Sequence, residues 1–334
     1  MSIDIHAHVI PESYIRAVES EIPAIAPKVD KEGDDWYLRY PWGRRSGPVP
    51  AGAFDTEQRL EAMDRQDLTM QALSVPPGHF LYHLEDHSQA AAAATLHNDA
   101  MIDMARERPD RFLMLGTLPL QAPDDAVAEL ERLSAIDEVA GLEFGCNVAG
   151  MAFDDPSLTE VWAAVNTSGL GVVLHPNNFE GAPDRMKDHY LANFVGNPTD
   201  STLAAGTLMF GGVLTDNPAL RIALLHGGGF LPYQVGRFAH GWDVRPEPRE
   251  KLDVSPRDLL DRFYFDTLTH DPASLGFLLE RVGSKRVCLG SDYPFDMADL
   301  DPVRTVRKII KDESVLDDVL DRTPRAFLTR KTDS

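Results

Sequence analysis

Eight short apolar segments alternate with helix-like segments, and this alternation constrains the fold more than any other feature of the sequence. The apolar segments are residues 1–8, 69–75, 112–118, 139–144, 171–174, 221–225, 263–267 and 287–290. Mostly continuous apolar runs are typical of parallel strands that are buried on both faces. Eight such strands between helices predict an α/β fold, a (β/α)8 TIM barrel. A doubly wound open sheet is the second possibility, disfavoured because no Gly-x-Gly-x-x-Gly motif follows an early strand.

Apolar residues at helical spacing predict the helices between these strands. The predicted helices span residues 54–66, 87–108, 126–134, 157–167, 202–213, 230–242, 272–281, 303–310 and 315–322. Residues 11–55 lack a clear period, and we interpret them as a small insertion over the barrel mouth with short strands. Residues 180–198 are interpreted as a long loop. We therefore expect one barrel over residues 1–334.

The composition argues against several classes of partner and compartment. A formal net charge of −21 makes nucleic acid or an anionic membrane a poor partner. Two cysteines, Cys146 and Cys288, are too few for a disulfide framework, so a reducing cytoplasm is expected. The sequence opens without a signal-peptide pattern and has no apolar run long enough to span a bilayer.

Polar residues gather where the predicted strands end. His6 and His8 end the first strand, and alternate strand residues face the same side, so both imidazoles can reach one point. His175 ends the fifth strand, His226 the sixth and Asp292 the eighth. Barrel active sites lie at these strand ends. A single strand-end histidine is more often structural, but five such groups at one rim are costly to bury unless they bind something. Converging imidazoles suit a divalent metal.

These motifs, taken in order, resemble the metal-dependent amidohydrolase superfamily, and within it the aminocarboxymuconate-semialdehyde decarboxylase-like branch. The resemblance rests on His6-Ala-His8, His175-Pro176, His226-Gly-Gly-Gly229 and Gly290-Ser-Asp292-Tyr-Pro-Phe295. Residues 54–64 and 115–123 resemble that branch too, so the likeness covers nearly the whole chain.

The resemblance implies a role for each strand-end residue. His6, His8, His175 and Asp292 would bind one metal ion, zinc in the first place and manganese as an alternative. His226 would be the general acid and base, a role suited to the ordinary pKa of histidine. Its alternatives are a fifth metal ligand or a structural histidine. Asp292 could instead serve as a catalytic base towards water.

The resemblance further implies non-oxidative decarboxylation of an unsaturated, muconate-like or aromatic carboxylic acid. A metal-dependent hydrolase or hydratase that acts on a related ring-cleavage product or lactone is the alternative. A non-catalytic metal-binding barrel is a third, weaker interpretation. Release of carbon dioxide would separate the first activity from the second.

Carboxylate substrates require cations, and the resemblance suggests where they lie. Arg237 and Arg245 match arginines that reach the neighbouring subunit's site, which implies a homodimer with shared sites. Arg44 or Arg45 of the insertion would add a contact from the same subunit, without a choice between them. Phe295 would supply an apolar wall.

The chain departs from the decarboxylase pattern in one part of the pocket wall. Asn177-Asn178 stands where the branch has Trp-Asp, and His189 and Asn193 stand where it has tryptophans. The specific substrate is therefore expected to differ more than the chemistry. Glu143, on the fourth strand, is interpreted as an ordinary salt-bridged barrel carboxylate rather than a site residue.

Overall fold

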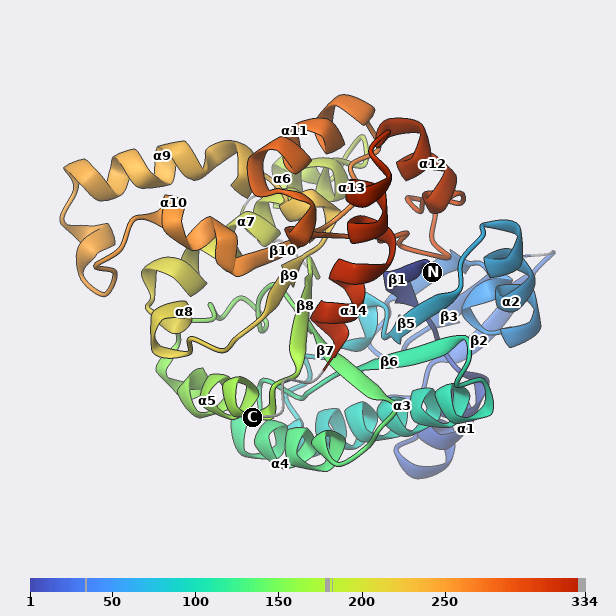
Figure 1. Cartoon of the computed structure of the whole chain (residues 1–334). Coiled ribbons are helices and arrows are strands. Elements are labelled where there is room, and N and C mark those ends of the chain that lie inside the picture. Colours follow the sequence, from blue (N-terminus) through green and yellow to red (C-terminus); the bar gives the residue numbers. More distant parts are fainter. Residues whose placement is uncertain (34, 178–180, 182, 330–334) are drawn as a thin grey trace.

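The computed structural model describes residues 1–33, 35–177, 181 and 183–329, and it confirms the predicted eight-stranded barrel (Figure 1). The barrel strands are β1 (Ile3–His8), β5 (Met70–Ser74), β6 (Phe112–Gly116), β7 (Val139–Gly145), β8 (Gly171–His175), β9 (Ile222–Leu224), β10 (Phe263–Asp266) and β11 (Val287–Cys288). They pair in this order, and each of these pairs is parallel. Every predicted strand is present, with bounds shifted by a few residues.

The barrel closes between β1 and the residues that follow β11. Ile5 N donates to Leu289 O at 3.0 Å, and Asp292 N donates to His6 O at 2.8 Å. These backbone bonds bring the two ends of the sequence together at one seam. A histidine near the start of the chain and an aspartate near its end thereby become neighbours.

Helices surround the barrel, and the predicted helices are found among them (Figure 1). They are α2 (Thr56–Arg65), α3 (His87–Glu107), α4 (Pro123–Ser134), α5 (Thr159–Ser168), α7 (Asn197–Phe210), α8 (Val213–Asp216), α9 (Leu231–Val244), α10 (Pro256–Leu259), α11 (Pro272–Val282), α12 (Pro302–Ile309), α13 (Glu313–Asp317) and α14 (Thr323–Leu328). Among the described residues, no helix combines the length and apolar character needed to cross a bilayer.

The hydrophobic core has an inner and an outer part. The outer cluster fills the space between the strands and the surrounding helices. The inner cluster includes Ile3, Ala72 and Val173 from the strands, and Phe327 and Leu328 of α14 pack against it. Since α14 follows the last barrel unit and packs on this cluster, it covers one end of the barrel and leaves the strand carboxyl ends for the site.

Residues 12–49 form a helix and a small sheet beside the barrel. The helix α1 (Glu12–Glu21) precedes the antiparallel strands β2 (Lys28–Glu32), β3 (Asp35–Arg39) and β4 (Arg45–Val49). The short strands agree with the expectation for this segment, whereas α1 was not predicted. Its buried face rests on only Tyr14 and Val18, which leaves little apolar periodicity to detect. The limits of the insertion at residues 11–55 stay a prediction.

The prediction of a long loop over residues 180–198 is wrong for most of the described part. Helix α6 (Pro183–Met186) and a π-helical turn (Ala192–Gly196) occupy it, and α7 begins at Asn197. Pro198 lies in the first turn of α7, where proline is well tolerated because no N–H partner is needed. Residues 180 and 182 of this prediction lie outside the described residues.

Candidate active site

A β-bulge in β1 prepares its two histidines for a common site. The pairing of β1 with β5 shifts by one residue between Asp4 and Ala7. Such a bulge bends the strand and re-aims a side chain, often beside an active site. His6 lies within this shift and His8 follows it, and both side chains are completely buried.

Three histidines have one ring nitrogen fixed and the other free. The Nδ1 partners are Asp266 Oδ2 at 2.8 Å for His6, Val75 O at 3.0 Å for His8 and Pro176 O at 2.7 Å for His175. The Nε2 atoms of all three are buried and have no hydrogen-bond partner in the described part of the chain. Fixing Nδ1 sets each ring's orientation and leaves Nε2 as the available donor atom.

The free nitrogens converge on one carboxylate. Asp292 Oδ1 lies 3.3 Å from His6 Nε2 and 3.1 Å from His8 Nε2, while Oδ2 lies 3.6 Å from His226 Nε2. Donor atoms of His6, His175, His226 and Asp292 all lie within 4.8 Å of one another. The structure therefore brings together all five strand-end residues that the sequence singled out.

The arrangement fits a bound cation. Buried imidazole nitrogens without partners are costly unless something binds them. Burial opposes ionisation of Asp292, but the adjacent His6 charge and the contacts from the histidines hold the pKa of Asp292 well below its usual range. An ionised carboxylate beside free Nε2 atoms is the mixed nitrogen and oxygen donor set that zinc and related divalent ions accept.

His226 differs from the other three histidines in its exposure and its backbone. Its side chain is 19% exposed, whereas the side chains of His6 and His8 are completely buried. The backbone of His226 adopts a φ of 55°, and Asp292 adopts a φ of 61°. Left-handed conformations of non-glycine residues are uncommon and cluster at functional sites. The four residues whose donor atoms lie within 4.8 Å of one another include His226 and omit His8. Among the four histidines of the site, His226 is the one that lines both cavities described below.

Asp266 connects His6 with the turn that carries His226, and it was not among the residues predicted from the sequence. One oxygen accepts from His6 Nδ1, while the other accepts from the N–H of Gly227, directly after His226, at 2.8 Å. Its pKa lies below the usual value because its contacts with His6 outweigh the effect of burial. Asp266 ends β10 just as the histidines end their strands, so its position was a signal that could have been used.

A buried polar network supports β1 from the side of α2. The guanidinium of Arg59 donates to Gln71 Oε1 at 3.0 Å, and also to the backbone oxygen of His8. Gln71 in turn donates to Asp4, which accepts from Ser291 Oγ at 2.5 Å. The network ties the backbone of His8 to the residue before Asp292, and so fixes their relative position.

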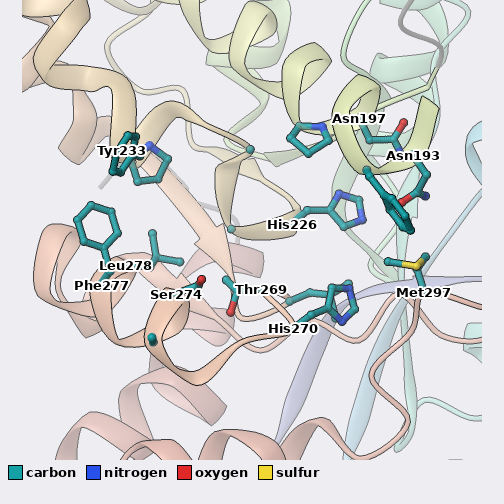
Figure 2. A pocket seen from close by; sticks show the side chains of 17 residues that line it. Asn193, Asn197, His226, Tyr233, Thr269, His270, Ser274, Phe277, Leu278 and Met297 are labelled. Atoms are coloured by element: carbon teal, nitrogen blue, oxygen red, sulfur yellow. The ribbon is translucent and has the colours of Figure 1, made fainter. Parts of the chain in front are cut away.

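Two cavities meet at the strand ends. The first, of about 400 Å³, is called the reaction cavity here, and residues that line it include Arg44, His79, His175, His226, Asp292 and Phe295. The second, the adjoining cavity, has a volume of about 610 Å³ (Figure 2). Its lining is largely apolar and includes Phe194, Tyr233, Leu268, Phe277 and Leu278. His226 borders both cavities.

The structure separates Arg44 from Arg45. Arg44 lines the reaction cavity, and no ion pair of its guanidinium occurs among the described residues. Its guanidinium lies against Gly78, where a Cβ would come within 3.0 Å of Arg44 Nη2. Arg45 instead pairs with Glu32 at 2.7 Å and lies 3.6 Å from the ring centre of Tyr37. Arg44 is thus the arginine available to a ligand.

Arg237 and Arg245 lie away from both cavities of their own chain. Arg237 is exposed on α9 and lines neither cavity. Arg245 is exposed at the end of α9 and pairs with Glu247. Neither arginine is therefore placed to contact a ligand beside His226 of its own chain.

The polar wall suggested by the sequence is partly present. Asn193 lines both cavities, and Asn177 lines the reaction cavity, where Asn147 and Asp200 hold it. His189 is exposed and lines neither cavity. Asn178 lies outside the described residues.

Glu143 is not the well-paired carboxylate that was expected. It is buried, and its nearest basic atom is His8 Nδ1 at 4.0 Å, a nitrogen already bonded to a backbone oxygen. Within the described residues, neither carboxylate oxygen meets hydrogen-bond geometry with a partner. Burial outweighs the opposing charge of His6 and raises the pKa of Glu143 to about 8. Burial therefore favours the neutral form of this carboxyl group beside the site.

Comparisons with known proteins extend over the whole barrel. The family model described as amidohydrolase matches residues 3–330. The 2-amino-3-carboxymuconate-6-semialdehyde decarboxylase of Dictyostelium discoideum is 31% identical over 310 residues, which cover 92% of this chain and 86% of that protein.

Solved structures with the same fold include two decarboxylases. The 5-carboxyvanillate decarboxylase of Sphingomonas paucimobilis superposes with a TM-score of 0.82 at 23% identity and covers 98% of both chains. A dihydroxybenzoic acid decarboxylase of Polaromonas sp. JS666, with bound manganese and 2-nitroresorcinol, gives a TM-score of 0.81 at 19% identity. The alignment covers 98% of this chain and 96% of that one.

Proposed function

This chain belongs to the amidohydrolase family, and from that premise we propose that it is a metal-dependent, non-oxidative decarboxylase, a carboxy-lyase. Its substrate would be an unsaturated, muconate-like or aromatic carboxylic acid. The observation that carries the proposal is the convergence of three partnerless Nε2 atoms on Asp292, with His226 beside them facing two cavities. The named decarboxylases among the relatives and neighbours support the same reaction class.

One divalent ion would be held by His6, His8, His175 and Asp292. Three nitrogens and one carboxylate oxygen leave room for a further ligand and suit zinc, our first choice. Manganese is the alternative, supported by the ion in the dihydroxybenzoic acid decarboxylase. When bound, the ion supplies positive charge that attracts the substrate and stabilises negative charge in the transition state.

His226 supplies the proton that decarboxylation requires. When the bond between the substrate carbon and its carboxylate breaks, the electron pair must enter an unsaturated system. Protonation of that carbon by His226 Nε2–H creates such an acceptor, and carbon dioxide then leaves as the electron pair restores the unsaturation. His226 recovers its proton from water after product release. The carboxylate of Asp292 lies 3.6 Å from His226 Nε2, on the side of the imidazole where this proton is carried.

Arg44 and Phe295 would orient the substrate in the reaction cavity. The guanidinium of Arg44 has no acidic partner among the described residues and can bind a carboxylate through two parallel hydrogen bonds. The Phe295 ring lies 5.6 Å from the His8 ring and offers an apolar surface to an unsaturated substrate. Arg45, bound to Glu32, is the weaker candidate.

The active form would be a homodimer in which Arg237 and Arg245 serve the partner's site. Both arginines are exposed on or next to α9, which also presents Tyr233 at 77% exposure. Phe277 of α11 and Phe194 lie exposed near it along the adjoining cavity. A large apolar surface of this kind is typical of an interface. A two-fold axis would make the exchange of arginines reciprocal.

The location we propose is the cytoplasm. Cys146 and Cys288 are buried free thiols, which agrees with a reducing compartment.

Metal analysis combined with a product screen tests the proposed function. The purified protein should contain about one divalent ion per chain. It should release carbon dioxide from at least one member of a panel of carboxylated aromatic and muconate compounds. Addition of water without carbon dioxide release would support the hydrolase or hydratase instead. Full activity without metal would contradict the proposed mechanism.

A further inference from the structure

His79 lies in the wall of the reaction cavity and has no part in the mechanism proposed above. It ends the 3₁₀ turn Pro77–His79, which follows β5, and its backbone N–H donates to Pro76 O at 2.8 Å. The residue is buried, and it lines the reaction cavity together with Arg44. An imidazole in the wall of a ligand cavity can donate one hydrogen bond and accept another, so the contacts of each ring nitrogen decide what it offers to a ligand.

Three aromatic side chains fix the orientation of the His79 ring. Its centre lies 5.6 Å from that of Tyr14 and 5.4 Å from that of His97, and Tyr14 stacks on His97 at 4.0 Å. Tyr40 Oη lies 2.7 Å from His79 Nε2. A ring that is packed by neighbours and hydrogen-bonded at one nitrogen is preorganised for a ligand at the other nitrogen.

The contact with Tyr40 decides which nitrogen carries the hydrogen. Burial raises the pKa of the Tyr40 hydroxyl, which stays protonated, and His79 Nε2 is the one partner of this hydroxyl among the described residues. The buried O–H group is satisfied when it donates to Nε2, and a neutral imidazole that accepts at Nε2 carries its hydrogen on Nδ1. Burial, with smaller contributions from His97 and Arg44, holds the pKa of His79 well below its ordinary value.

The Nδ1 atom of His79 remains available to a ligand. It has no hydrogen-bond partner in the described part of the chain. Unlike the partnerless Nε2 atoms of His6, His8 and His175, it is not sealed from solvent. His79 therefore presents one N–H donor of fixed direction to the reaction cavity.

The turn that carries Tyr40 also carries Arg44. Tyr40 N donates to Arg44 O at 2.9 Å, and Gly43 N donates to Tyr40 O at 3.0 Å. The Arg44 guanidinium lies against Gly78, the residue before His79. The two turns thus contact each other at two points, and they place the His79 ring and the Arg44 guanidinium in one stretch of the cavity wall.

We propose that His79 Nδ1–H donates a hydrogen bond to the substrate carboxylate that Arg44 binds, and that Tyr40 positions this donor. The inference rests on the proposed function, in which the metal site holds the reacting end of the substrate. A carboxylate has about four acceptor positions, of which a guanidinium occupies two, so a third donor finds a free position. Hydrogen bonds to charged groups contribute more than those between neutral groups, so loss of the donor should be measurable.

Two probes that differ at one end test this contact. trans,trans-Muconate has a carboxylate at each end of a diene, whereas sorbate has a methyl group in place of one carboxylate. The Kd of each probe is measured by calorimetry on the metal-loaded protein. We expect the wild type to prefer muconate by roughly 100-fold, because Arg44 and His79 both contact the second carboxylate.

His79→Leu should lower this preference by about tenfold through weaker binding of muconate alone, with the metal content unchanged. His79→Asn should retain the preference within about threefold, because its side-chain N–H can take the place of Nδ1–H. Tyr40→Phe should lower it by about threefold, since the hydroxyl that directs the hydrogen to Nδ1 is lost. His83→Leu is the matched control, because His83 is exposed and lines neither cavity. His79→Ala replaces the leucine variant if that variant fails to fold.

The outcomes separate the inference from the proposed function. Equal affinity of the wild type for the two probes, or a preference that His79→Leu leaves unchanged, would overturn the inference. Equal weakening of both probes by His79→Leu would give His79 a structural task and would overturn it too. Carbon dioxide release from other acids would then leave the proposed function intact. A preference that responds to His79→Leu as expected, in a protein that releases no carbon dioxide from any acid, would retain the His79 contact and refute the decarboxylase.

Discussion

The floor and the rim of the reaction cavity are built in different ways. The floor consists of His6, His8, His175 and Asp292, which are almost completely buried and come from the barrel strands or directly follow them. The rim includes Arg44, which precedes β4, and Asn193 and Asn197 near the start of α7. The histidines of the floor each have a second residue that fixes the ring, whereas the rim side chains are exposed or half-buried.

This difference assigns separate tasks to the two regions. Rigid, buried groups preorganise charge and proton transfer at the floor, where small displacements are costly. Rim groups on connecting segments can change without disturbing the barrel, so they select the substrate. Substitutions in the floor should therefore abolish chemistry, and substitutions in the rim should alter binding.

The largest effect is expected from a change in the floor. His175→Ala removes one proposed metal ligand, so metal content should fall from about one ion per chain to nearly none. Activity should fall with it by about a thousandfold or more, since several kcal/mol of electrostatic stabilisation are lost. Metal analysis and carbon dioxide release are measured on the same sample. Full metal content in this variant would remove His175 from the ligand set.

His226→Ala distinguishes an acid from a ligand. The variant should keep its metal, while turnover falls by about 10²- to 10⁴-fold, the usual range for loss of a general acid or base. The two quantities are measured as for the first variant. Loss of metal together with turnover would show that His226 belongs to the floor.

Asp266→Asn probes the support behind the floor. An amide at this position binds the ring of His6 less strongly, so affinity for the metal should weaken by about 10- to 100-fold. Competition with a chelator measures this affinity directly. Asp271→Asn is the control, because Asp271 caps α11 on the surface and asparagine caps helices equally well. Equal metal affinities in the two variants would mean that the contact of Asp266 with His6 does not strengthen metal binding.

Arg44→Met and Arg45→Met form a matched pair at the rim. Loss of the cavity arginine should raise KM by about 10-fold or more, because a charged hydrogen bond to substrate is removed. Loss of Arg45 breaks a surface ion pair with Glu32, which contributes little, so KM should stay within about twofold. A larger KM effect for Arg45 would reverse the assignment.

The floor could be predicted from the sequence, whereas much of the rim could not. His175 and His226 end apolar strands, so barrel geometry alone places them at one edge. Asp266 was missed because it belongs to none of the motifs, and only its position at the end of a strand marked it. The choice between Arg44 and Arg45 depends on the pairing of β3 with β4, which opposes Arg39 to Arg45 and has no signal in the sequence. The positions of Asn193 and Asn197 depend on a π-helical turn and the start of α7, in a segment that was predicted to be a loop.

If Arg237 binds substrate in the partner's site, the rim of each reaction cavity includes a residue of the other subunit. Mixed dimers test this directly, although the activity expected to return is small. His226→Ala should lose turnover, and Arg237→Ala should bind substrate so weakly that little activity remains at substrate concentrations well below its KM. If Arg237 acts in the partner's site, a mixed dimer contains one site with both residues intact. Random exchange yields half mixed dimers with one complete site each, so activity should recover to about a quarter of the wild type. If Arg237 acts within its own subunit, each site of a mixed dimer lacks one residue and activity stays low. No recovery of activity after confirmed subunit exchange would mean that Arg237 does not act in the partner's site. An active monomer by sedimentation would mean the same.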